Sequence, residues 1–153
     1  NFAAERRGEP NFREQNPLHA PYCALSKVIS EYEPPDLDRC HVLGRKQDGA
    51  TLSPIGTQNF GPWEFEFYEG NGGHVRGETV IVCRELKLVF SGDIYVNIKG
   101  FSQEQQEFNA IAPLLMTGVD SDPAEARRCR DLLRKTYAGY LFCPGHGTVQ
   151  RNE

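Results

Sequence analysis

Three short glycine-containing segments carry the side chains of this sequence that are best suited to binding a metal ion. They are GGHVRGE at 72–78, FSGDIYVN at 90–97 and CPGHG at 143–147, and they contain His74, Asp93 and His146. Each of these residues stands beside an apolar run typical of a strand, where glycine lets the backbone turn and approach closely. A single such residue is more often structural, but the order of all three is more specific. The segments therefore predict imidazole and carboxylate groups that share one cleft, as in a metal site.

This order of motifs resembles the metallo-beta-lactamase fold superfamily over the stretch from residue 60 to residue 150. The resemblance implies that His74 completes one metal site, that Asp93 is the catalytic bridging ligand between two metals, and that His146 completes the second site. It also implies an α/β (α+β) fold: half or part of an αββα sandwich, with a mixed sheet and flanking helices. Zinc is the expected metal, two ions per complete site, and iron or manganese would suit the same donors.

Members of that superfamily also carry an upstream His-x-His-x-Asp-His cluster, which is missing here. The four histidines of the chain are at positions 19, 41, 74 and 146, and no two of them have that spacing. Because a catalytic zinc takes three protein ligands and a water, three residues divided between two half-sites should bind metal weakly or not at all. The chain also begins without methionine. We therefore expect the C-terminal part of a longer metallohydrolase, inactive alone, rather than a degenerate member of the superfamily.

The resemblance implies one domain over residues 1–153, the C-terminal portion of a metallo-beta-lactamase-like domain, with a variable helical and loop region at 1–60 and the motif-bearing part at 61–150. In the first region, apolar residues at helical spacing predict a helix that ends before Pro34, and turn-rich segments follow around HVLG and TLSPI. These apolar residues are Leu25, Val28, Ile29 and Tyr32.

The motif-bearing part is predicted to alternate strands with ligand loops. Trp63, Phe65 and Phe67 alternate with polar residues, which indicates a strand with one buried face. The runs TVIVC and KLVF predict an antiparallel hairpin whose open end brings His74 and Asp93 together. The later strand YLFC then leads into His146.

Two helices are predicted between Asp93 and His146. The pair Ser102 and Gln105 is a capping box for a first helix through Phe108, Ile111 and Leu115, which Pro113 bends or ends. The order Asp122, Pro123, Glu125 is typical of a helix start. This second helix is expected to bury Ala126, Cys129, Leu132 and Leu133.

Composition narrows the class of protein. The net charge of -4 argues against a nucleic-acid binder, and the cluster Arg127, Arg128, Arg130, Arg134 and Lys135 is interpreted as a solvated helix face. No apolar run approaches the roughly 20 residues that cross a bilayer. The five cysteines are odd in number and form no C-x-x-C pair, which favours reduced thiols in a cytoplasmic protein. Cys143 as a nucleophile beside His146 is a weaker alternative, because no third group is evident.

Two classes of function stay open. The first is a metal-dependent hydrolase of an unknown small molecule, with substrate contacts from Pro54 to Gly73 and from Tyr95 to Phe101, and with Lys99 as a possible partner for an anionic group. The second is a non-catalytic binding or assembly module that has lost its metal site. No nucleic-acid or membrane partner is expected. A homodimer is expected, because a partial sandwich leaves sheet surface and strand edges facing water.

Overall fold

The computed structural model divides the chain into two compact units, which are described separately. The first comprises Asn1–Val42 and Ala110–Val119, and the second comprises Leu43–Asn109 and Asp120–Glu153. The structure describes residues 6–10, 17, 19–41, 43–44, 47–97, 101–107 and 120–153. The expected single domain with a boundary near residue 60 stays a prediction.

The first unit contains the helix α2, Ala20–Ser30, and the 3₁₀ turn η1, Leu37–Arg39. The predicted helix is therefore present, and it ends where Glu31 adopts a left-handed conformation ahead of the two prolines. Its large aliphatic residues Leu25, Val28 and Ile29 are exposed, with Val28 at 76%. Among the residues that the structure describes, no helix is both long and apolar enough to cross a membrane.

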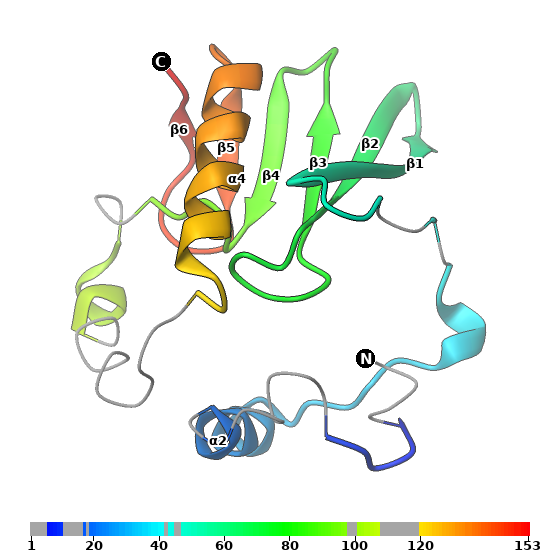
Figure 1. Ribbon diagram of the computed structural model, residues 1–153, viewed down its shortest axis with the longest axis vertical. Helices are drawn as coiled ribbons and strands as arrows, with labels where there is room; N and C mark the ends of the chain where they lie inside the picture. Colours follow the sequence, from blue (N-terminus) through cyan, green and yellow to red (C-terminus); the bar gives the residue numbers. More distant parts are fainter. Residues whose placement is uncertain are drawn as a thin grey trace. The chain divides into compact units, whose positions relative to one another are not determined.

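The second unit is built on a six-stranded sheet in the order β1-β2-β3-β4-β5-β6 (Figure 1). All neighbouring strands are antiparallel except β4 and β5, which are parallel and are joined by a connection that contains the helix α4. This mixed sheet with a helix against it confirms the predicted α+β class. The bounds are β1 Leu52–Phe60, β2 Trp63–Gly70, β3 Thr79–Cys83, β4 Leu88–Gly92, α4 Pro123–Thr136, β5 Leu141–Pro144 and β6 Gln150–Arg151.

The predicted strands β2, β3, β4 and β5 are confirmed, and β3 and β4 form the predicted antiparallel hairpin. The sequence prediction was wrong for β1, which was expected to be turn-rich. β1 is an edge strand, where proline is tolerated, and a bulge between Pro54 and Gly56 accommodates the glycine. As a result, most of the segment from Pro54 to Gly73, expected to be a variable substrate loop, is a β-hairpin.

The two faces of the sheet have different surroundings. On one face Val82, Val89 and Phe142 are paired across β3, β4 and β5, and all three are fully buried. The helix α4 lies against this face (Figure 1), and the core cluster combines these strands with the helix and the loop after β4. Its members are Val80, Val82, Val89, Ile94, Cys129, Leu133, Tyr137 and Phe142.

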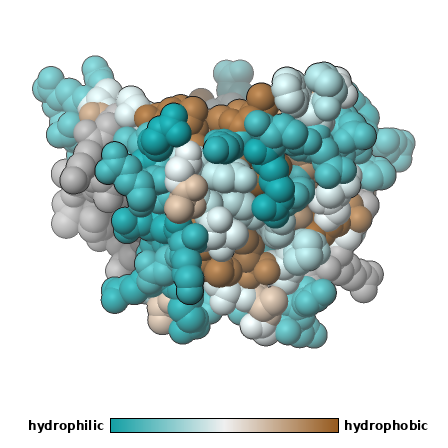
Figure 2. All heavy atoms as spheres, turned by 90° about the horizontal axis from the view of Figure 1, so that it is seen from above, coloured by the Kyte–Doolittle hydropathy of each residue, from teal (hydrophilic) through white to brown (hydrophobic). Residues whose placement is uncertain are grey.

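The opposite face carries the paired row Phe67, Ile81 and Phe90, which is only partly buried. Exposed apolar side chains elsewhere in this unit include Phe60 and Leu86. Brown apolar patches lie among hydrophilic residues on the surface drawn in Figure 2. The homodimer expected through exposed sheet surface stays a prediction.

The helix α4 begins as its sequence predicts. The Asp122 carboxylate accepts hydrogen bonds from the backbone N–H groups of Ala124 and Glu125, both at 3.0 Å, and Pro123 is the first helical residue. The helix buries the predicted Ala126, Cys129 and Leu133. Leu132 was also expected in the core but is exposed, because it lies next to Leu133 in the sequence and points away from the buried stripe.

The capping box before the other predicted helix is present. The Ser102 backbone N–H donates to Gln105 Oε1 at 3.0 Å, and the Gln105 backbone N–H donates to Ser102 Oγ at 3.3 Å. Residues 103–107 are helical. The predicted positions Phe108, Ile111, Pro113 and Leu115 lie outside the described residues.

An ion pair across the sheet should make stability depend on pH. Arg84 Nε donates to Glu66 Oε1 at 2.5 Å, and this guanidinium lowers the pKa of the Glu66 carboxyl below its ordinary value. The unfolded chain therefore binds a proton at Glu66 more readily than the folded chain does. As a result, the free energy of unfolding should fall as the pH is lowered below about 5, and it should continue to fall below the ordinary glutamate pKa of about 4.3. The contribution is modest, since Arg84 is half exposed.

Urea unfolding between about pH 3 and pH 6 measures this dependence. The Glu66→Gln variant cannot titrate at this position, so its unfolding free energy should fall less over the same range. Equal slopes for the wild type and the variant would contradict the assigned role of the ion pair.

Candidate metal site

The loop that carries His74 is stabilised by hydrogen bonds to the side chain of Glu78. The Glu78 carboxylate is buried and accepts hydrogen bonds from the backbone N–H groups of Gly73, His74 and Val75 at 3.2, 3.0 and 3.1 Å. A carboxylate with several backbone donors stabilises a tight loop, because it satisfies N–H groups that the turn leaves without strand partners. Glu78 therefore sets the backbone position of His74.

The same loop also forms backbone hydrogen bonds with the two residues directly before α4. The backbone N–H of Ser121 donates to the carbonyl of His74 at 3.0 Å, and that of Asp122 donates to the carbonyl of Gly73 at 2.8 Å. A Cβ atom at Gly73 would lie 2.4 Å from the backbone nitrogen of Ala126. Only glycine allows the loop to approach the helix this closely.

Asp93 and His146 are brought together by the parallel pairing of β4 and β5. Both residues follow the ends of their strands, and parallel strands end at the same edge of a sheet. The Gly145 backbone N–H donates to the carbonyl of Gly92 at 2.7 Å. A Cβ atom at Gly145 would lie 2.2 Å from Asp93 Oδ1, so glycine leaves the space that the carboxylate occupies.

The three predicted side chains meet around Asp93. His74 Nε2 lies 3.8 Å from Asp93 Oδ2, and His146 Nε2 lies 3.5 Å from Asp93 Oδ1. Two donors bound to one tetrahedral zinc at the usual distances are about 3.4 Å apart, so both separations are close to what a shared ion requires. Since each imidazole faces a different oxygen, the carboxylate has the arrangement of a bridging ligand.

The three side chains form two pairs that share Asp93, namely His74 with Asp93 and His146 with Asp93. Within the described part of the chain, no group of three or more His, Cys, Asp or Glu side chains is arranged to hold one metal ion. His74 is largely buried, whereas His146 is 57% exposed. The chemistry of the donors fits zinc, iron or manganese, but their role as metal ligands stays a prediction.

Asp120 is a residue of the site that the sequence did not reveal. His74 Nδ1 lies 3.0 Å from Asp120 Oδ1, on the opposite side of the imidazole from Asp93. Arg130 Nη2 donates to Asp120 Oδ2 at 3.2 Å. The sequence predicted that Arg130 belongs to a solvated helix face. This prediction was wrong, because the Arg130 guanidinium donates to Asp120, the residue that contacts His74. No sequence signal separates Asp120 from the nearby cap residue Asp122.

The remaining candidate residues have no established part in the site. Lys99 lies outside the described residues. Cys143 is partly buried, and this burial raises the pKa of its thiol, which disfavours the nucleophilic thiolate. None of the five cysteines, all of which belong to the described residues, forms a disulfide, and Cys83 and Cys129 are buried as predicted.

Comparisons with known proteins were made for the sequence and for the fold. No protein-family model matches the sequence, and no curated protein matches it. Among solved structures, the fold is similar to a metallo-beta-lactamase from Pontibacter korlensis, with a TM-score of 0.49 and 17% sequence identity. The match covers 98% of this chain, which spans 56% of the other chain.

Proposed function

We propose that this chain supplies His74, Asp93 and His146 as metal ligands of a metal-dependent hydrolase of the metallo-beta-lactamase type. The observation that supports this most directly is the position of Asp93, whose two oxygens each face the Nε2 atom of a different histidine. A bridging carboxylate with one histidine on either side is a suitable donor set for two adjacent cations.

Each residue has a distinct part in this proposal. Asp93 would hold both cations, His74 would fix the position of one from a largely buried loop, and His146 would hold the other at the exposed side. When bound, the cations supply a water of lowered pKa and polarise an oxygen of the substrate. The hard and borderline donors favour zinc, with iron or manganese as alternatives.

The ligand count limits what the described residues can do alone. A catalytic zinc has three protein ligands plus a water, whereas each half of this cluster has one histidine and a share of Asp93. Full binding therefore needs further ligands from outside the described residues. Without them, we expect weak binding and no hydrolysis.

A zinc titration with a competing chelator tests the proposal. Compared with the wild type, His146→Ala should bind zinc at least about tenfold more weakly, because one half of the cluster then has only Asp93. His41→Ala is the matched control, since this exposed histidine belongs to the other unit and its loss should not change the affinity. Hydrolysis of model esters and lactams by the wild type should not exceed that by His146→Ala.

One result would contradict the proposal, and another would contradict only the need for further ligands. Equal zinc affinity in the wild type and His146→Ala would favour the alternative of a binding or assembly module without a metal site. Hydrolysis by the wild type that is lost in His146→Ala would show that these ligands suffice without others. The cytoplasmic location and the identity of the substrate remain proposals.

A further inference from the structure

We propose that Asp120 and Arg130 form a positioning pair that holds His74 in its Nδ1–H tautomer, so that the lone pair of Nε2 faces Asp93. This inference rests on the proposed function only where it concerns metal affinity. The orientation of the imidazole can be measured in the metal-free protein.

The tautomer follows from the chemistry of the contact between His74 and Asp120. An ionised carboxylate can only accept hydrogen bonds, so at 3.0 Å from Asp120 Oδ1 the Nδ1 atom of His74 must be the donor. A neutral imidazole carries one proton, and Nε2 is then left with a lone pair. Nε2 is the atom that lies 3.8 Å from Asp93 Oδ2. Asp120 therefore directs the ligand atom toward the bridging carboxylate.

Burial makes this contact specific. The side chains of His74 and Asp120 are 14% and 15% exposed, so few water molecules compete for the hydrogen bond. A buried carboxylate needs a compensating charge, and Arg130 supplies it at 3.2 Å from Asp120 Oδ2. The guanidinium thereby places a positive charge beside the carboxylate that contacts His74.

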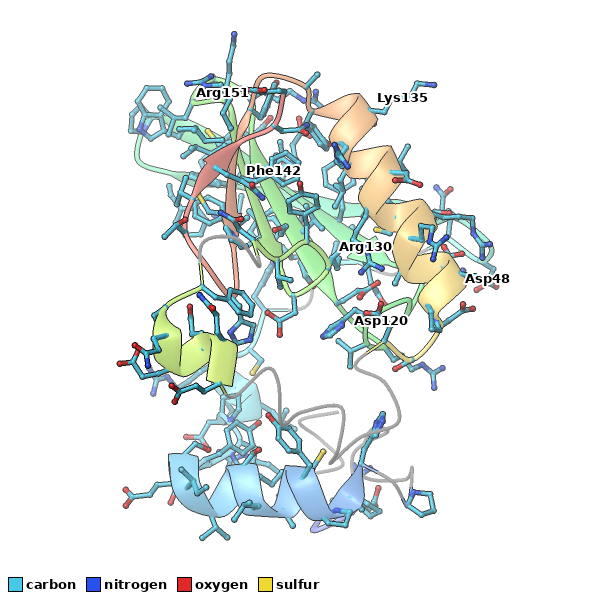
Figure 3. The ribbon with its side chains drawn as sticks, turned by 90° about the vertical axis from the view of Figure 1, so that its left-hand side faces the viewer. Asp48, Asp120, Arg130, Lys135, Phe142 and Arg151 are labelled. Carbon is cyan, nitrogen blue, oxygen red and sulfur yellow. The ribbon has the colours of Figure 1, made fainter. Side chains whose placement is uncertain are left out.

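Arg130 also connects the two ligand loops. Its Nη1 atom donates to the carbonyl of Ile94 at 3.4 Å, directly after Asp93, while its Nη2 atom binds Asp120. In Figure 3 Asp120 lies just before the start of α4, and Arg130 lies near the middle of the helix. Cys129 and Leu133 anchor α4 in the core. Arg130 belongs to this helix, so its two hydrogen bonds hold the surroundings of His74 and Asp93 in fixed positions relative to α4. Metal-bound histidines usually have such a carboxylate partner on their second nitrogen, which orients the ring.

Long-range ¹⁵N–¹H correlation spectra of the metal-free full chain at about pH 8.5 test the tautomer, since histidine is ordinarily neutral there. A His74→Gln spectrum assigns the His74 signals. The wild type should show the Nδ1–H form, whereas Asp120→Ala should shift His74 toward the Nε2–H form that free imidazole prefers in water. Asp120→Asn should retain part of the Nδ1–H population, because its amide oxygen still accepts. Arg130→Met should give a mixture.

Asp122→Ala is the control for a structural effect. It removes the side-chain cap of α4 and leaves the contact between Asp120 and His74 in place, so the tautomer should not change. An Nε2–H tautomer in the wild type, or an unchanged tautomer in Asp120→Ala, would overturn the proposal. If Asp120→Ala does not fold, Asp120→Asn and Arg130→Met decide by the same criterion.

Zinc titration provides the second readout. Asp120→Ala should lower the zinc affinity by about 10- to 100-fold, as expected for loss of the partner that orients a ligand, while Asp122→Ala should leave it near the wild-type value. If the wild type binds no zinc, the proposed function fails. The tautomer measurement then still confirms or overturns the positioning pair.

Discussion

Replacing Glu78 by alanine is expected to lower the free energy of unfolding by about 3 to 5 kcal/mol, because three backbone N–H groups would lose a charged acceptor worth roughly 1.5 kcal/mol or more each. These groups belong to Gly73, His74 and Val75, and the acceptor is buried. Such a loss is large beside a total stability of about 5 to 15 kcal/mol. Urea unfolding followed by circular dichroism measures it.

The loop itself should respond more strongly than the rest of the fold. Amide hydrogen exchange at 73–75 should accelerate in Glu78→Ala, since these are the groups that lose their acceptor. Glu64→Ala is the matched control: Glu64 is exposed on β2, and its loss should change stability by no more than about 0.5 kcal/mol. If the two variants unfold alike, Glu78 does not hold the loop.

Replacing Phe142 by alanine should cost a similar amount, about 3 to 5 kcal/mol, because it leaves a cavity in the core. Phe142 is fully buried, and its ring centroid lies 5.1 Å from that of Tyr95. It is also in β5, three residues before Gly145 in the turn that carries His146. The variant should therefore lose stability and also disturb the pairing of β5 with β4.

Phe60→Ala is the matched control, because it makes the same substitution at an exposed position. Phe60 is exposed and contacts Phe65 edge to face at 5.4 Å, so its removal should cost only about 1 kcal/mol. Thermal and urea unfolding of both variants measure the difference. A loss in Phe142→Ala no larger than in Phe60→Ala would contradict the assigned core.

Local signals in the sequence were sufficient for most elements of the second unit. The hairpin of β3 and β4 was predictable because two apolar runs are separated by a short polar turn, and α4 was predictable because Asp122 and Pro123 form a cap. These patterns depend on neighbours in the chain. Local signals misled at β1, because the segment around TLSPI has residues typical of turns, whereas a strand at the sheet edge tolerates proline.

By itself, the sequence determined which residues are able to bind a metal and which strands lead into them, since residue type, glycine spacing and apolar runs are local properties. The tertiary structure alone decided that His74 and His146 face separate oxygens of Asp93, that Glu78 holds the His74 loop, and that Asp120 contacts the His74 imidazole while Arg130 binds Asp120. The physical reason is distance along the chain. Asp120 lies 46 residues from His74, and such contacts follow from the pairing of β4 with β5 and the packing of α4, which no local pattern encodes.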